Sequence, residues 1–170
     1  DKLKRRMLGL VDQMESKFLP PTFTIRSFFK HLWGYTGRGG ISVSRLEQIM
    51  RMRQAMLQVG YSCQNIPINT IKQLCQARNS WGMEMDKPPK KSFIGETLAT
   101  YEKGLAEDKV FDEISMMHHV LDELYSTSKK LLKSYLKSSF ENVFMNGTNG
   151  IPSLRKIELE LIQAIESSLN

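Results

Sequence analysis

The stretch that decides the fold is DKVFDEISMMHHVLDELYSTSKKLLKSYLKSSFENVFM, residues 108–145. It contains neither glycine nor proline, the two residue types that most often interrupt a helix. At about 100° per residue, one set of apolar side chains stays on a single face from end to end. That set is Val110, Ile114, Met117, Leu121, Leu124, Leu132, Tyr135, Leu136 and Val143. The period predicts helix rather than strand across the whole stretch.

The length of this helix leaves two alternatives open. One continuous helix over 108–145 would be about 57 Å long, which is long for a chain of 170 residues. Either the helix projects beyond the body of the protein, or it breaks at 126–128, where Ser126, Thr127 and Ser128 follow one another. In both cases the apolar phase is constant, so we expect 108–125 and 129–145 to bury one shared face.

The remainder of the chain also shows mainly helical spacing. A capping-box pattern, Ser44 followed by Glu47, predicts a helix that ends at Gly60. The apolar segment 23–33 is predicted to be a buried helix, with a strand at 22–26 as the alternative because Thr, Phe and Ile favour sheets. Further helices are predicted at 2–18, 68–79, 92–103 and from Pro152 to the C-terminus. The expected fold is an all-α, six- or seven-helix globular bundle without a substantial sheet.

Length and composition indicate an ordinary globular domain. The chain has 170 residues, of which 41% are hydrophobic and 25% charged, so we expect a single helical domain over 1–170, with 1–18 as a docking helix or arm. Two cysteines, Cys63 and Cys75, are too few for a disulfide framework. No signal peptide and no run of 18 apolar residues is present, which predicts an intracellular protein, cytoplasmic or nuclear, without a membrane partner. The first residue is Asp1 rather than Met, so the chain is compatible with a fragment of a longer protein.

The charge is unevenly distributed along the chain. The net charge is +6 and the isoelectric point about 9.3. Residues 26–53 contain six basic residues and one acidic residue, whereas 107–123 is predominantly acidic. A basic N-terminal half attracts phosphates or acidic proteins. Two classes of partner therefore have to be weighed.

The leading hypothesis is a non-enzymatic domain that binds a protein partner through an apolar surface lined by methionine and aromatic residues. Methionine suits adaptable binding surfaces. The segment before Pro88 is expected to be an exposed loop. The glycine-rich segment 34–40 is interpreted as a plain linker, and the alternative is a mobile loop that offers Tyr35 and Arg38 to a partner. The candidate contact residues are Tyr35, Arg38, Trp81, Met83 and Met85.

The alternative is a basic nucleic-acid-binding domain, for RNA rather than DNA. A row of cations can track phosphates, and each neutralised phosphate adds salt-dependent affinity. The candidate residues are Arg26, Lys30, Arg38, Arg45, Arg51 and Lys72. The lysines at 129, 130, 133 and 137 also share one face, but a solvated face near a helix C-terminus explains them as well.

No enzyme motif is present in the sequence. The glycines at 34–40 lack the spacing and the Gly-Lys-Ser/Thr ending of a phosphate-cradling loop. His118 and His119 point to different faces of a helix, His118 to the apolar side and His119 to the polar side, so they cannot close a zinc site. We therefore expect no catalytic residues, no metal and no cofactor.

The helical phase of 45–59 carries one further expectation. Counted from Arg45, Arg53 falls near 80° and Arg51 near 240°. Arg53 thus lies in the middle of one wide apolar arc, which is formed by Val59, Met52, Met56, Ile49, Leu46, Leu57 and Met50. We predict that Arg53 is largely buried and hydrogen-bonded and that Arg51 is exposed. A charge buried in an apolar face would require a partner, because an unpaired one costs several kcal/mol.

Overall fold

The structure, a computed structural model, describes residues 23–36, 40–61, 65–89, 91–126, 131–139 and 154–169. These ranges contain seven helices and two two-residue strands, so the protein is all-α, as predicted. The helices are α2 (Ile25–Trp33), α3 (Arg45–Gln58), α4 (Ile68–Met83), α5 (Phe93–Glu107), α6 (Glu113–Tyr125), α7 (Leu131–Ser139) and α8 (Lys156–Leu169). The strands β1 (Ile41–Ser42) and β2 (Val110–Phe111) pair in parallel. The predicted helix or arm at 1–18 lies outside the described residues.

Polar side chains determine where four of these helices begin. Thr24, Ser44, Ser92 and Asp112 each accept a hydrogen bond from the backbone N–H three residues later. Such caps satisfy one of the N–H groups that a helix leaves without an intrahelical acceptor. The cap at Ser44 confirms the predicted capping position, and the cap at Thr24 explains why 25–33 is a helix rather than a strand.

Two helices extend beyond their predicted ends. α4 continues to Met83 because Gly82 packs directly against Ile114 of α6, where even a Cβ would lie 2.3 Å from the isoleucine methyl. α5 continues through Gly104 to Glu107. The predicted C-terminal ends of α4 and α5 were therefore wrong, because tertiary packing outweighs the weak helix propensity of glycine.

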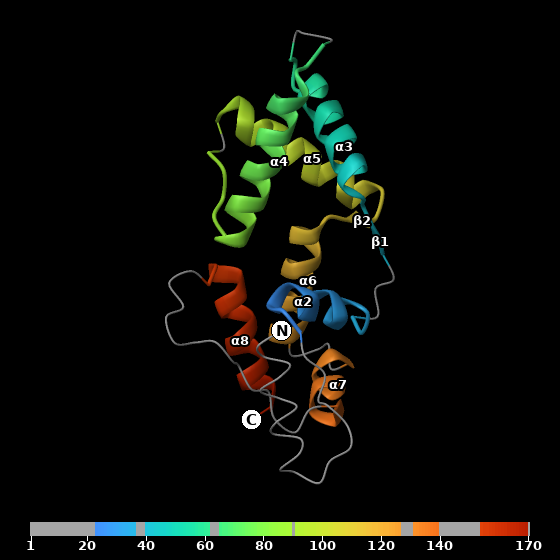
Figure 1. Cartoon of the computed structure of the whole chain (residues 1–170), viewed down its shortest axis with the longest axis vertical. Helices are drawn as coiled ribbons and strands as arrows, with labels where there is room; N and C mark the ends of the chain where they lie inside the picture. Colours follow the sequence, from blue (N-terminus) through green and yellow to red (C-terminus); the bar gives the residue numbers. More distant parts are fainter. Residues whose placement is uncertain are drawn as a thin grey trace, which may run out of the picture.

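The described helices pack around two hydrophobic clusters along the long axis of the molecule (Figure 1). The upper cluster joins α3, α4 and α5, with Met52, Met56, Leu98 and Tyr101 among its most buried side chains. The lower cluster joins α2, α6, α7 and α8. The end of α4 and the start of α6 connect the two clusters. We call the two groups the upper lobe and the lower lobe; whether they form a single domain stays a prediction.

The long apolar stretch is broken, as the second alternative predicted. α6 ends at Tyr125, and Ser126 has an extended backbone, with φ −66° and ψ 132°. Leu121 and Leu124 of α6 and Leu132 and Leu136 of α7 all belong to the lower cluster. The shared buried face is therefore confirmed for the described part of the stretch. At the other end, α6 begins at Glu113 rather than at Asp108, since Asp112 caps it and Val110–Phe111 pairs with β1.

α6 is buried on nearly all sides because it lies between the other helices. The imidazole of His118 donates a hydrogen bond from Nε2 to the backbone carbonyl oxygen of Gly82, at 3.1 Å. His119 was predicted on a polar face, and this prediction was wrong. Its side chain is 11% exposed, contacts Trp33 and Phe111 ring to ring, and lies 3.4 Å from a carboxylate oxygen of Glu123. Because α6 is enclosed on nearly all sides, the side of it that carries His119 is not solvated.

None of the described helices combines the length and the apolar character that crossing a bilayer requires.

Candidate functional site

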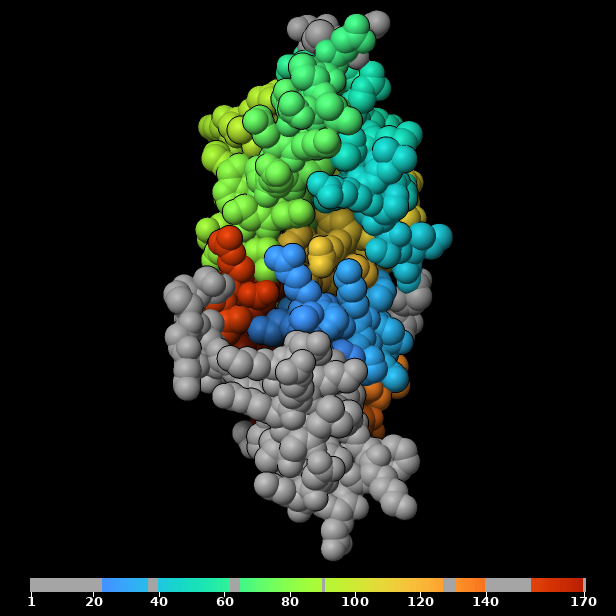
Figure 2. All heavy atoms as spheres, viewed as in Figure 1, coloured from blue at the N-terminus to red at the C-terminus, as the bar shows by residue number. Residues whose placement is uncertain are grey.

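A polar cleft of about 410 Å³ lies between the two lobes. Atoms of α6 are visible between α2 below and α3 and α4 above (Figure 2). The upper lobe contributes the start of α3 and one face of α4, and the lower lobe contributes α2 and the start of α6. The lining side chains are Lys30, Ser42, Val43, Arg45, Gln48, Ile49, Lys72, Cys75, Gln76, Asn79, Asp112, Glu113 and Met116.

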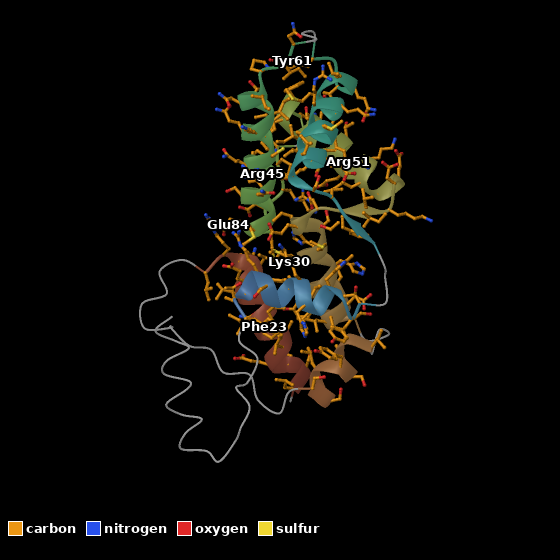
Figure 3. The ribbon with its side chains drawn as sticks, turned by 45° about the vertical axis from the view of Figure 1, so that its right-hand side comes forward. Phe23, Lys30, Arg45, Arg51, Tyr61 and Glu84 are labelled. Carbon is orange, nitrogen blue, oxygen red and sulfur yellow. The ribbon has the colours of Figure 1, made fainter. Side chains whose placement is uncertain are left out.

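Three cationic side chains from three helices, Lys30, Arg45 and Lys72, line this cleft, and we call them its rim. Lys30 lies on the side of α2 that faces the upper lobe, and Arg45 lies at the start of α3 (Figure 3). Lys72 faces them from α4. Lys30 is 3.9 Å from Glu113 but remains largely exposed. Within the described part of the chain, Arg45 and Lys72 form no ion pair.

Amide side chains supply most of the other polar groups of the cleft. Gln48 of α3 and Gln76 and Asn79 of α4 each carry both a donor and an acceptor. Gln48 lies three residues after Arg45, and Gln76 and Asn79 lie four and seven residues after Lys72, so each helix presents its amides and its cation on the same side. The cleft therefore offers positive charge together with directional hydrogen-bonding groups.

The floor of the cleft rests on a buried polar network centred on Asp112. The carboxylate accepts hydrogen bonds from the backbone N–H of Ser115, at 2.7 Å, and from the hydroxyl of Tyr101, at 3.2 Å. The guanidinium of Arg78 lies 3.8 Å from Asp112 and 3.3 Å from Glu102. Asp112 is 2% exposed, so these contacts replace its hydration. The network fixes α6 against α4 and α5.

Two weak acids near Asp112, the Cys75 thiol and the Tyr101 hydroxyl, are held in their neutral forms. Burial raises the pKa of the Cys75 thiol to about 11, and the negative charge of Asp112 adds to that effect. The positive charge of Arg45 acts on the same thiol in the opposite direction. Burial, followed by the charge of Asp112, also raises the pKa of Tyr101. Cys75 is therefore a protonated, buried thiol and not a nucleophile at neutral pH.

The orientation of α3 contradicts the prediction for its arginines. Arg53 is exposed, and Arg51 is the partly buried one, bridging Glu47 and Asp108. The hydrogen bond to Asp108 is the largest effect that raises the pKa of Arg51. Arg45 and Arg51 point to different sides of α3 (Figure 3). The helix buries the half of the predicted arc that contains Met52 and Met56, because that face meets α5, and exposes the half with Leu46, Met50 and Leu57.

We expect Arg51→Ala to destabilise the fold by about 1 kcal/mol and Arg53→Ala by less than about 0.5 kcal/mol. Arg51 connects α3 to the residue that caps the end of α5, whereas Arg53 is exposed. Urea denaturation monitored by circular dichroism measures both free energies of unfolding. A larger loss for Arg53→Ala would contradict the observed orientation of α3.

The outward arc of α3 is an apolar stripe. Leu46 and Met50 are 68% and 64% exposed, and Leu57 is also exposed. With Arg53 they occupy positions i, i+4, i+7 and i+11, the spacing of a and d positions in a coiled coil. We call Leu46, Met50, Arg53 and Leu57 the α3 stripe. No described element covers it.

The candidate contact residues near Pro88 lie elsewhere than predicted. Trp81 and Met83 belong to α4, and Met83 is buried in the lower cluster. Met85 follows in a turn and packs partly against the same cluster. The prediction of an exposed apolar loop was wrong, because the end of α4 supplies the contact between the lobes. A role of Trp81, Met83 and Met85 in partner binding stays a prediction, and exposure in a loop no longer supports it.

Tyr35 follows α2 and is exposed, and its ring stacks on Tyr135 of α7 with centroids 3.5 Å apart. The Tyr135 hydroxyl is hydrogen-bonded to His31, at 2.6 Å, and burial raises the pKa of Tyr135. These contacts attach the end of α2 to α7. Arg38, the other candidate of this segment, lies outside the described residues.

The structure brings together half of the residues proposed for nucleic-acid binding. Lys30, Arg45 and Lys72 share the cleft. Arg51 is held by two carboxylates on another side of α3, and Arg26 is exposed on α2 but does not line the cleft. The described residues therefore do not form the continuous row of cations that the alternative assumed.

Sequence reasoning missed the residues beneath the cleft, although signals for them exist. Arg78 follows Leu74 and Cys75 at helical spacing, on the face that α4 buries. Asp112 stands immediately before a helix, in a position typical of a capping residue. Among the described residues, no group of three or more His, Cys, Asp or Glu side chains is arranged to hold a metal ion. Comparison of the chain with protein-family models, with curated proteins and with solved structures finds no match.

Proposed function

We propose that the protein is a non-enzymatic interaction domain that binds an amphipathic helix of a protein partner on the α3 stripe. The observation that carries the proposal is the exposure of Leu46, Met50 and Leu57 on one side of a well-capped helix. Large apolar side chains that adjoin one another on a surface favour burial against a partner. Their a/d spacing matches the seam of a second helix.

Charge favours a partner helix with acidic residues beside its apolar side chains. Residues 26–53 have a net charge of +5, and Arg53 lies within the stripe itself. A carboxylate opposite Arg53 would add electrostatic complementarity and favour one register over others. The expected partner is therefore a helix whose apolar stripe is flanked by Asp or Glu.

The same charge argument disfavours two other occupants of the α3 stripe, namely residues 2–18 of this chain and α3 of a second copy. Residues 2–18 show amphipathic spacing but have five basic and two acidic residues, so they repel a basic surface. A second copy of α3 would bring the arginines of two basic stripes close together. Both pairings place like charges in contact, which is unfavourable.

The test replaces Met50 or, in a separate protein, Gln58 with a photo-crosslinking amino acid. Both side chains are exposed on α3, but Gln58 lies outside the stripe. The protein is irradiated in a nuclease-treated cell extract, and crosslinked peptides are identified by mass spectrometry. We expect position 50, and not position 58, to crosslink to an amphipathic acidic helix.

A synthetic peptide of that helix then provides the quantitative measurement. We expect Met50→Glu to weaken binding at least tenfold, because it places a charge in the apolar seam and faces acidic residues. Gln58→Glu introduces the same charge on the same helix and is expected to leave affinity unchanged. Equal crosslinking from both positions, crosslinks only to a second copy of the chain, or equal effects of the two substitutions would refute the proposal.

A further inference from the structure

We propose that the cleft between the lobes binds a single nucleotide, with the phosphate at the cationic rim and the base against the amide side chains. This site is separate from the α3 stripe and does not depend on the function proposed for it. The volume of about 410 Å³ lies within the range of small-molecule sites. The argument rests on which groups converge there and on how they are already paired.

The rim is suited to an anion because its positive charge is only partly neutralised by the protein. Lys30, Arg45 and Lys72 approach from three different helices, so an anion between them would contact both lobes. Glu113 pairs with Lys30, but Arg45 and Lys72 form no ion pair among the described residues. A phosphate group would supply several acceptor oxygens for such donors.

The carboxylate at the floor does not prevent anion binding. Asp112 already accepts hydrogen bonds from Ser115 and Tyr101, and the guanidinium of Arg78 lies beneath it. Its charge is therefore compensated from the side away from the cleft. The three rim cations and Arg78 outnumber the three carboxylates near them, those of Asp112, Glu113 and Glu102, so the cleft keeps a net positive charge.

The amide side chains indicate that the ligand has more than a phosphate. Gln48, Gln76 and Asn79 present planar groups that donate and accept at once, which matches the edges of nucleobases. Within the part of the chain that the structure describes, these three side chains form no hydrogen bond to other protein groups. A base in the cleft would satisfy them, whereas inorganic phosphate would leave them to water.

A discrete ligand fits this arrangement better than a nucleic-acid strand. A strand needs cations that continue along a surface, and the neighbouring candidates do not extend the rim. Arg51 is bound by Glu47 and Asp108, and Arg26 does not line the cleft. The three cations instead line one bounded cleft of about 410 Å³, which suits a discrete phosphate-bearing ligand.

The test is isothermal titration calorimetry of the full chain with adenosine 5′-monophosphate, adenosine, inorganic phosphate and a ten-nucleotide single-stranded RNA as separate probes. We expect the monophosphate to bind at least tenfold more tightly than adenosine or phosphate. Lys72→Gln and Arg45→Gln should each weaken its binding at least fivefold. Asn79→Ala should weaken binding of the monophosphate but leave binding of inorganic phosphate unchanged.

Arg26→Gln is the matched control, since it removes an exposed arginine of α2 outside the cleft. It should leave the affinity for the monophosphate unchanged, and circular dichroism should show that all variants are folded. Three results would overturn the proposal. They are the absence of binding to the monophosphate, equal binding of phosphate alone, and tighter, steeply salt-dependent binding of the RNA that Arg26→Gln weakens as much as Lys72→Gln does.

Discussion

Leu121→Ala is expected to lower the free energy of unfolding by about 2–5 kcal/mol. Leu121 is 2% exposed and lies in the lower cluster, where α6 meets the other helices of that lobe. Truncation removes buried apolar contacts and leaves a cavity that a central helix, held on several sides, cannot readily close. Urea denaturation monitored by circular dichroism gives the change in free energy.

Leu131→Ala is the matched control for this substitution. It makes the same chemical change in α7, but Leu131 is 62% exposed. We expect its cost to stay below about 0.5 kcal/mol. Similar midpoints for the two variants would show that α6 does not bury the face assigned to it.

Asp112→Ala is expected to destabilise the fold by about 3–5 kcal/mol, as the removal of one partner from a buried ionic network does. The substitution deletes the cap of α6 and the acceptor for the Tyr101 hydroxyl. It also leaves the guanidinium of Arg78, whose side chain is 9% exposed, without its buried counter-ion. Thermal and urea denaturation of the same variant measure the loss.

Two further variants separate the contributions at this position. Asp112→Asn keeps a side-chain acceptor for the cap but removes the charge, so we expect an intermediate loss. Asp122→Ala removes an exposed carboxylate from the same helix and should cost little. Losses of equal size for Asp112→Ala and Asp122→Ala would contradict the buried network.

Local patterns predicted most of the helices because the information lies within a few residues. Ser44 and Glu47 marked the start of α3, and the apolar period of 108–145 marked α6 and α7. Predicted ends were less accurate. Gly104 does not interrupt α5, and α4 continues past Arg78, because packing between helices stabilises turns that local propensity disfavours.

The rotation of α3 shows where sequence reasoning failed and why. The apolar arc predicted for this helix is wide, with Met52 and Met56 in one half and Leu46, Met50 and Leu57 in the other. Periodicity alone cannot say which half meets the core when both have apolar residues. The choice depends on where α5 lies, and the exchange of roles between Arg51 and Arg53 follows from it.

The candidate cleft was predictable only in part. Lys30, Arg45 and Lys72 were identified as candidate phosphate-binding residues because they are basic, but nothing in their sequence separation says that they share a cleft. The amides of Gln76 and Asn79 gave no signal, because such residues are ordinary on a helix surface. Their significance depends on lining the same cleft as the three cations.

The sequence by itself determined the helical class, most helix starts, the basic character of the N-terminal half and the shared apolar face of α6 and α7. These properties depend on periodicity, capping and composition, which act over a few residues or over the whole chain. Only the tertiary structure decided which face of α3 is buried, that Asp112 and Arg78 form a network, and that three cations line one cleft between the two lobes. The physical reason is that these properties come from contacts between residues far apart in sequence, whose geometry is set by how whole helices pack.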